Sequence, residues 1–193
     1  MGQGCKSGAI KTIIMKNGKL KAATGAKLKK TKVATTVEIG ITPAHAQSVA
    51  NKLQQLLADE QVLYAKTRNY HWNVEGSNFM EMHLFYERLY SELAEVIDQI
   101  AERIRKIGHY AQGRMEDFLK QAHLLEGEYT NDQTVQLENL LSDHETIIRY
   151  LRNDIDDFDE KFKDAGSADF ITGILQRHEE WAWFIRSYVA NPK

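Results

Sequence analysis

The amino-acid sequence predicts an all-α protein, built as a bundle of four long helices, and three observations support this fold class. The chain has 193 residues, which is enough for one domain with a sizeable core. Its only two prolines, Pro43 and Pro192, lie near the edges of the region with helical periodicity, which favours long helices over short strands. Within that region apolar residues recur every three or four positions, as they do on one face of a helix.

The first two helices are separated by a short break around a glycine. The first helix is expected over about residues 43–73, where a threonine–proline pair begins the periodic region. Ser77 or Asn78 is expected to cap the second helix, with Glu81 completing a capping box. Apolar spacing carries this second helix to its end near Gly108.

The second half of the chain predicts two more long helices and one short one. A short amphipathic helix is expected over about residues 114–122, and a long helix over about 131–163. Gly166 and Ser167 are expected to break the chain before a last, aromatic-rich helix over about 168–189. Because the second and third long helices are joined by a long connection, the order up-down-down-up is available to the bundle.

Charge divides the chain into a basic tail, residues 1–42, and a helical domain, residues 43–190. The tail carries nine lysines and one acidic residue, which gives +8, whereas the rest of the chain carries −10. Such a tail suits an anionic partner, with nucleic acid the first candidate, or is a solvated segment that aids solubility. Asn17-Gly18 within it is a hairpin signal. The candidate DNA-binding lysines are Lys6, Lys11, Lys16, Lys19, Lys21, Lys27, Lys29, Lys30 and Lys32.

Cysteine content and hydropathy bear on the expected location. The single cysteine, Cys5, excludes an internal disulfide framework, which fits a reducing cytoplasm. No run of about 18 apolar residues is present, so no membrane span is expected. No apolar stretch typical of a secretory signal follows the first residue. We therefore expect a cytoplasmic protein with no membrane partner.

Four potential metal ligands share one stripe of the second helix. His83 and Glu87 are four residues apart, as are Asp98 and Glu102, so each pair lies on one helical face. The eleven steps from Glu87 to Asp98 leave a net rotation of only about 20°, which places all four on the same stripe. His83 and Asp98 are nevertheless about 22 Å apart along the helix, too far to bind one ion within one chain.

Dimerisation solves this problem. If the second helix packs antiparallel against its copy across a two-fold axis, the histidine end of one chain meets the acidic end of the other, and two equivalent sites form. His71, at the end of the first helix, can add another nitrogen. The resulting mixture of imidazole and carboxylate suits Fe, Mn or Zn. Each of these residues taken alone is as easily a solvated surface residue.

Several further segments accompany this stripe: residues 69–74 (NYHWNV), Phe79, His83, Phe85, residues 98–105 (DQIAERIR), Gly108, Phe118, residues 167–169 (SAD) and residues 183–186 (WFIR). Together they resemble the signature of the Dps family, the DNA-protection proteins of starved cells. The resemblance covers about residues 43–190.

The resemblance implies a ferritin-like four-helix bundle, with the short extra helix in the connection between the second and third long helices, that assembles into a hollow shell of twelve subunits. It implies an intersubunit ferroxidase centre that oxidises Fe(II) to Fe(III), preferably with hydrogen peroxide, with His71, His83, Asp98 and Glu102 as ligands. The family usually has aspartate where this chain has Glu87. The glutamate side chain is one methylene longer than aspartate, and we still include Glu87 among the expected ligands. Bacterioferritin-type centres are disfavoured, because no glutamate here is followed by a histidine three residues later.

Other residues gain roles by the same resemblance. Trp72 would lie close to the iron centre, with core packing as the alternative. Glu160, Asp164 and Asp169 would line the negatively charged pore through which iron enters, the alternative being a solvated acidic helix face. The remaining histidines lack a matching stripe and receive no site role: His45, His109, His123, His144 and His178.

Two other functions stay open from the sequence. The first is a nucleoid-compacting, DNA-binding shell protein with weak or no ferroxidase activity, which the lysine-rich tail favours. The second is a storage or interaction shell with little catalysis, because Glu87 departs from the usual aspartate.

Overall fold

The structure, a computed structural model, describes residues 37–190, and these form an all-helical bundle. Four long helices and two short helical segments make up the described chain. In order they are α1 (Pro43–Asn73), α2 (Phe79–Lys106), α3 (Met115–Gln121), α4 (Gln133–Asp156), the π-helical turn η1 (Asp157–Lys161) and α5 (Ala165–Val189). The fold class predicted from the sequence is confirmed.

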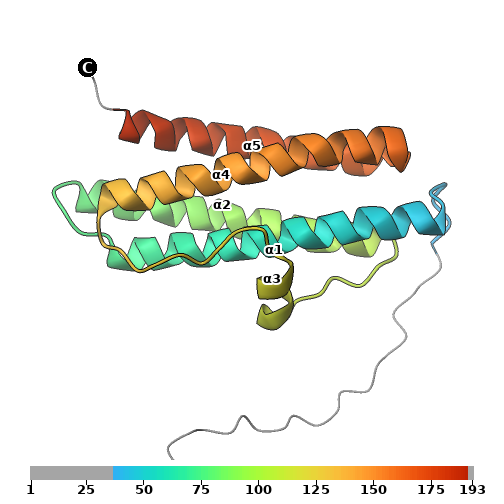
Figure 1. Cartoon of the computed structure of the whole chain (residues 1–193), viewed down its shortest axis with the longest axis horizontal. Helices are drawn as coiled ribbons and strands as arrows, with labels where there is room; N and C mark the ends of the chain where they lie inside the picture. Colours follow the sequence, from blue (N-terminus) through green and yellow to red (C-terminus); the bar gives the residue numbers. More distant parts are fainter. Residues whose placement is uncertain (1–36, 191–193) are drawn as a thin grey trace, which may run out of the picture. The chain divides into compact units, whose positions relative to one another are not determined.

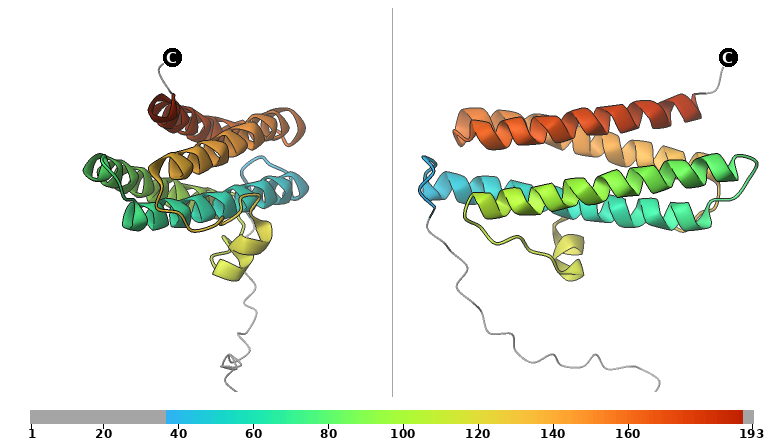
Figure 2. Two further views of the ribbon diagram at one scale, coloured as in Figure 1. Left: turned by 60° about the vertical axis from the view of Figure 1, so that its left-hand side comes forward. Right: turned by 180° about the vertical axis from the view of Figure 1, so that it is seen from behind.

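The long helices pack as two antiparallel hairpins laid against each other. α1 pairs with α2, and α4 pairs with α5, in two layers (Figures 1 and 2). The connection from α2 to α4 returns along the length of the bundle, so α2 and α4 run in the same direction (Figure 1). The bundle therefore has the up-down-down-up order that the long connection allowed.

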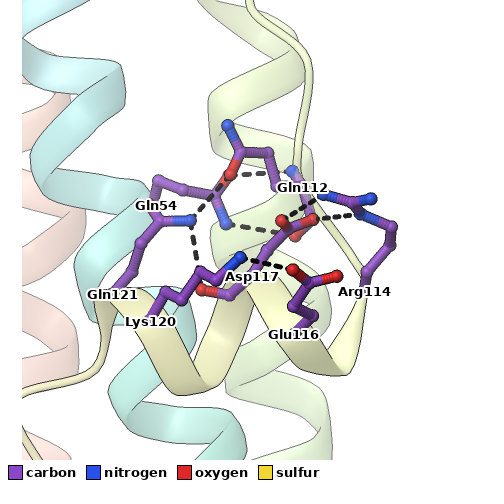
Figure 3. A network of polar contacts seen from close by, with 7 residues as sticks. All are labelled: Gln54, Gln112, Arg114, Glu116, Asp117, Lys120 and Gln121. Carbon is purple, nitrogen blue, oxygen red and sulfur yellow. Dashed lines mark hydrogen bonds and ion pairs between the residues drawn. The ribbon is translucent and has the colours of Figure 1, made fainter.

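The short helix α3 lies on the outer side of α1, within that connection (Figure 1). Its attachment depends on Gln54 of α1, whose amide nitrogen donates to the backbone oxygen of Gln112 at 3.1 Å. The backbone nitrogen of Gln112 donates back to the Gln54 side-chain oxygen at 2.8 Å, and Gln121 donates to the Gln112 side chain at 2.7 Å (Figure 3). This reciprocal pair satisfies a buried glutamine and fixes the connection to α1.

The start of α1 is confirmed, whereas the capping box predicted for α2 is wrong. Thr42 caps α1, its hydroxyl accepting from the backbone nitrogen of His45 at 3.3 Å, and proline takes the first turn. Asn78 is the residue before α2 but makes no side-chain capping bond. Glu81 instead accepts a hydrogen bond from the hydroxyl of Tyr188 in α5, at 2.9 Å, so a tertiary contact replaces the local one.

The turn between α4 and α5 also differs from the prediction. The break falls at residues 162–164, where Lys163 has a φ of 57°, and not at Gly166 and Ser167. These two residues belong to the first turn of α5, which Asp164 caps by accepting from the Ser167 backbone nitrogen at 2.9 Å. A Cβ on Gly166 would lie 3.0 Å from the Arg103 guanidinium, so the glycine permits this close approach.

The core runs the length of the bundle and is mostly apolar. Side chains of α1, α2, α4 and α5 contribute, among them Leu53, Leu93, Leu140 and Ile171. Burial of such faces is the main stabilising contribution in a helix bundle. One group of polar side chains interrupts the apolar core, formed by Glu60, His144 and His178, each with 0% exposure.

Candidate metal centre

His71 and His83 face each other across the hairpin that joins α1 to α2. His71 lies in the last turn of α1 and His83 in the second turn of α2. Their rings are stacked, with centroids 3.7 Å apart and an interplanar angle of 20°. The sequence placed both residues among the ligands, and the fold brings these two together.

Reciprocal hydrogen bonds fix both imidazole rings. The Nδ1 of His71 lies 2.8 Å from the backbone oxygen of His83, and the Nδ1 of His83 lies 2.9 Å from the backbone oxygen of His71. A carbonyl oxygen can only accept, so we assign the proton to Nδ1 in both rings. In the neutral form of each ring, Nε2 then carries a free lone pair, which is the form of histidine that binds a metal.

Two aromatic rings extend this stack on either side. Phe79 stacks on His83 at 5.2 Å and 29°, and Tyr90 meets His71 edge-on at 5.2 Å and 77°. Aromatic contacts of this kind restrict the motion of a ring and contribute about 0.5–1.5 kcal/mol each. The two histidines are therefore held in place before any metal arrives.

The acidic ligand candidates lie on the exposed face of α2. Glu87, Asp98 and Glu102 are all exposed. Glu102 pairs with Lys106 at 3.0 Å, whereas the side chains of Glu87 and Asp98 have no hydrogen bond or ion pair to any described residue. Nowhere in residues 37–190 do three His, Cys, Asp or Glu side chains gather closely enough to hold a metal ion. A single chain thus presents ligands at both ends of α2 but completes no site.

Trp72 is not a core residue of the single chain, because 64% of it is exposed. Its ring lies 5.1 Å from the guanidinium carbon of Arg68, which also lies over the rings of Tyr64 and Tyr90. Tyr90 in turn contacts His71. The core-packing alternative for Trp72 is therefore wrong within one chain, and the tryptophan belongs to an aromatic cluster beside the histidine pair.

The three residues predicted to line an acidic pore lie in different environments. Glu160 and Asp169 are exposed. Asp164 is buried, and its carboxylate accepts from Arg103 at 3.2 Å and from the Ser167 hydroxyl at 2.5 Å while it caps α5. This placement gives Asp164 a structural role, so the pore hypothesis depends on the other two.

Two of the histidines to which the sequence assigned no role lie in the core. His144 and His178 are fully buried and hydrogen-bonded to each other. Their positions do carry a signal, because His144 lies seven residues after Leu137 and seven before Leu151, both of them buried. A histidine in register with an apolar stripe is expected to face the core.

The basic tail falls outside the described residues. All nine candidate DNA-binding lysines and the Asn17-Gly18 signal lie within residues 1–36. The tail therefore remains a prediction. Among the helices that the structure describes, none is sufficiently long and apolar to span a membrane.

Comparison with known proteins identifies the family. Residues 50–193 match the family model of the ferritin-like domain. An uncharacterised low-temperature-induced protein of Nostoc sp. is 44% identical over 155 residues, which cover 79% of this chain and 86% of that protein. The DNA protection during starvation protein 2 of Bacillus anthracis is 31% identical over 143 residues, covering 74% of this chain and 97% of that protein.

Solved structures agree with these relatives. A Dps protein from Bacillus brevis has a TM-score of 0.74 and 29% identity, covering 78% of this chain and 100% of its own. The Dps protein of Vibrio cholerae, described as a member of a superfamily of ferritin-like diiron-carboxylate proteins, has a TM-score of 0.76 and 27% identity, covering 83% and 100%. With the fold, the histidine pair and these matches taken together, the chain belongs to the Dps family of ferritin-like proteins.

Proposed function

We propose that this protein binds Fe(II) between two subunits, oxidises it, and stores the ferric product inside a closed shell of its own copies, thereby protecting DNA from oxidative damage. One observation carries the proposal. The His71 and His83 rings are fixed by reciprocal Nδ1 hydrogen bonds, which leave both Nε2 atoms free for a metal. A histidine pair with only a surface role would not need both tautomers fixed in this way.

A two-fold partner supplies the ligands that one chain lacks. If α2 packs antiparallel against its copy, Asp98 and Glu102 of the partner subunit approach His71 and His83, and Glu87 lies one turn from His83 on the same stripe. The side chains of Asp98 and Glu87 make no hydrogen bond or ion pair with any described residue, so they are available for this role. Each two-fold contact then holds two equivalent sites.

The ligand set suits oxidation of iron. Imidazole and carboxylate bind Fe(II), and the negative charge of the carboxylates favours the more highly charged Fe(III). Hydrogen peroxide accepts two electrons, one from each of two Fe(II) ions, and with two protons yields two water molecules. Because both electrons pass to one peroxide, no hydroxyl radical is released.

The proposed function also requires a closed shell and a route by which Fe(II) enters it. A shell of twelve subunits is the expected assembly, with the sites at its two-fold contacts. Glu160 and Asp169 are exposed near the start of α5, where copies around a shared axis would concentrate Fe(II) by their combined field. Acidic side chains on the inner surface would then nucleate the ferric oxide.

The test is the absorbance change after Fe(II) and hydrogen peroxide are added to the assembled protein. Wild type should produce the ferric signal rapidly. The double variant His83→Ala/Asp98→Ala should lose most of the rate while its shell persists in light scattering. Glu180→Gln, an exposed acid on α5, is the matched control and should oxidise iron at the wild-type rate. If the double variant kept the full rate, the site would lie elsewhere.

A second candidate function is DNA compaction, and the lysine-rich tail favours it. Nine lysines on each of many copies would give numerous weak phosphate contacts, hence tight, sequence-indifferent and strongly salt-dependent binding. The tail has no aromatic residue to stack on bases. Under this hypothesis the shell is a cytoplasmic, nucleoid-associated protein.

Gel-shift titrations at two salt concentrations distinguish the roles of tail and body. Full-length protein should shift DNA at low salt, and a variant lacking residues 1–40 should not. Absence of a shift with the full-length shell at low salt would exclude the tail as a DNA tether. Equal shifts with both proteins would place the contacts on the helical body instead.

A further inference from the structure

Glu60 of α1, His178 of α5 and His144 of α4 form a continuous hydrogen-bonded chain through the core. The Nε2 of His178 lies 2.8 Å from Glu60 Oε1, and its Nδ1 lies 2.9 Å from the Nδ1 of His144. All three side chains are fully buried. Two atoms at the ends of the chain, Glu60 Oε2 and His144 Nε2, are buried without a hydrogen-bond partner.

The arrangement does not suit a metal ion. A carboxylate and two imidazoles are familiar metal ligands, but here Glu60 and His144 contact opposite nitrogens of His178. They therefore cannot bind one ion together with it. A hydrogen-bonded chain of this kind binds protons instead.

Each of the two hydrogen bonds in this cluster requires one proton. Two imidazole nitrogens approach to 2.9 Å only when one of them carries a hydrogen, and the same holds for the contact between Glu60 and His178. With these two protons alone, the cluster is an ionised carboxylate beside two neutral rings and has a net charge of −1. An uncompensated charge in an apolar core is strongly unfavourable.

A third proton removes that charge. It has a place on His144 Nε2 or on Glu60 Oε2, the two unpartnered end atoms, and the cluster is then neutral overall, either as an ion pair of Glu60 with protonated His178 or with all three groups uncharged. Burial, together with the charge of His178, holds the pKa of His144 well below its ordinary value, so His144 itself remains a neutral ring. Protons can shift along the existing hydrogen bonds without movement of heavier atoms.

Neighbouring charged groups do not neutralise the negative charge of the Glu60–His178–His144 cluster. Trp181 contacts the rings of both His144 and His178. Its indole nitrogen donates to Glu92 of α2, which also pairs with Arg88, and Arg177 of α5 lies over its ring. Partial burial acts to raise the pKa of Glu92, but hydrogen bonds from Arg88 and Trp181 outweigh it and lower that pKa.

The charged groups of α1 and α4 near this cluster have partners of their own. Asp59 of α1 binds His123 at 2.8 Å, and Lys66 of α1 pairs with Asp143 of α4 at 2.6 Å. Glu145 of α4 pairs with Arg186 on the surface. Among the described residues of α1, Glu60 alone hydrogen-bonds to either ring, through His178.

We propose that Glu60, His178 and His144 form a buried proton-binding site that holds three protons across neutral pH and makes the stability of the bundle depend on the third. The unfolded chain, with an ionised carboxylate and two histidines of pKa about 6.5, holds about two of these protons at pH 8 and about four at pH 5. Folding therefore takes up about one proton in alkaline solution and releases about one in acid. The contribution of this cluster to stability is greatest near pH 6.5 and falls on both sides.

Glu60→Gln removes the need for the third proton. A neutral amide keeps the hydrogen bond to His178 and leaves no negative charge for that proton to neutralise. Above pH 5.5 the unfolded wild type and variant bind equal numbers of these protons, while the folded wild type binds one more. The ratio of their unfolding constants should therefore change about tenfold per pH unit, with the variant gaining on wild type as pH rises. Denaturant unfolding of full-length assembled protein at equal concentrations, from pH 5.5 to 8.5, measures this ratio.

Glu180→Gln is the matched control, an exposed glutamate two residues from His178, and its ratio to wild type should stay constant. A ratio for Glu60→Gln that is equally constant would overturn the proposal. If Glu60→Gln does not assemble, histidine-selective ¹⁵N solid-state resonance of the wild-type shell gives the answer. One N–H shared between the two Nδ1 atoms and a protonated His144 Nε2, both present at pH 7, would support it. A deprotonated His144 Nε2 beside an ionised Glu60 carboxylate, the latter seen in its ¹³C resonance, would contradict it.

Discussion

The chain contains two histidine pairs that the fold treats in opposite ways. In the pair of His71 and His83, both Nδ1 atoms donate to backbone oxygens, and both Nε2 atoms remain free. In the pair of His144 and His178, the two Nδ1 atoms face each other at 2.9 Å. The first pair is partly exposed at one end of the bundle, whereas the second is fully buried at its centre.

The difference shows that the partner of Nδ1 decides what a histidine can do. A carbonyl oxygen fixes the proton on Nδ1 and leaves a lone pair for a metal. A second imidazole makes the proton itself the bound species, since either ring can carry it. Under our two proposals the same residue type serves metal binding in one region and proton binding in the other, so substitutions in the two pairs should have separable effects.

The largest effect is expected from His178→Ala. Its loss leaves Glu60 and His144 buried without their common partner, so the free energy of unfolding should fall by about 3 kcal/mol or more. Denaturant unfolding measures this, with His109→Ala as the control expected to change stability by less than about 0.5 kcal/mol. Fe(II) binding by the shells that do assemble should be unchanged. A loss of iron binding with unaltered stability would reverse the two roles.

His83→Ala should show the opposite pattern. Removal of a ligand should lower peroxide-driven iron oxidation by about 10- to 100-fold, the range seen when even an outer-shell partner of a metal ligand is lost. The free energy of unfolding should fall by only about 1–2 kcal/mol, less than for His178→Ala, because the lost hydrogen bond and ring contacts lie at a partly buried site. Stopped-flow absorbance and denaturant unfolding of the same preparation give both values. Full oxidation activity in this variant would exclude the histidine pair as the site.

A smaller effect is expected at Glu87, where the Dps family usually has aspartate. Glu87→Asp shortens the side chain by one methylene and should alter the initial oxidation rate by only a few-fold, since the carboxylate is retained. We expect the rate to rise. The same change at Glu95, another exposed acid of α2, should leave the rate unaltered. A large fall for Glu87→Asp would mean that the longer side chain is required in this protein.

Much of the fold was predictable because it depends on periodic spacing. Helix positions and the extra short helix follow from apolar residues spaced by three and four, and the long connection allowed the observed order of the bundle. The errors occurred where a distant residue decided the outcome. Glu81 bonds to Tyr188, 107 positions away, instead of capping its own helix. Asp164 ends the loop before α5 because Arg103 and Ser167 bind it.

The candidate site was predictable as a set of residues but not as a geometry. Spacing placed four ligands on one stripe of α2, yet nothing in it indicates that His71 and His83 exchange hydrogen bonds with each other's backbone. The buried pair was missed because His144 and His178 match no stripe of potential metal ligands. Its register with Leu137 and Leu151 was the available signal, and Glu60 gave none, since its partner lies on another helix.

The central claim, that one chain's histidines and the other chain's carboxylates complete each site, is tested most directly by co-expressing His83→Ala with Asp98→Asn. In a mixed dimer one of the two sites has every ligand intact, so random pairing should restore about a quarter of all sites. Co-expression of His83→Ala with His71→Ala is the matched control, because both changes affect the histidine end and no mixed dimer regains a whole site. Iron oxidation at about a quarter of the wild-type level in the first mixture, and none in the second, is the predicted result. Activity in the first mixture no higher than in either variant alone would contradict the intersubunit site.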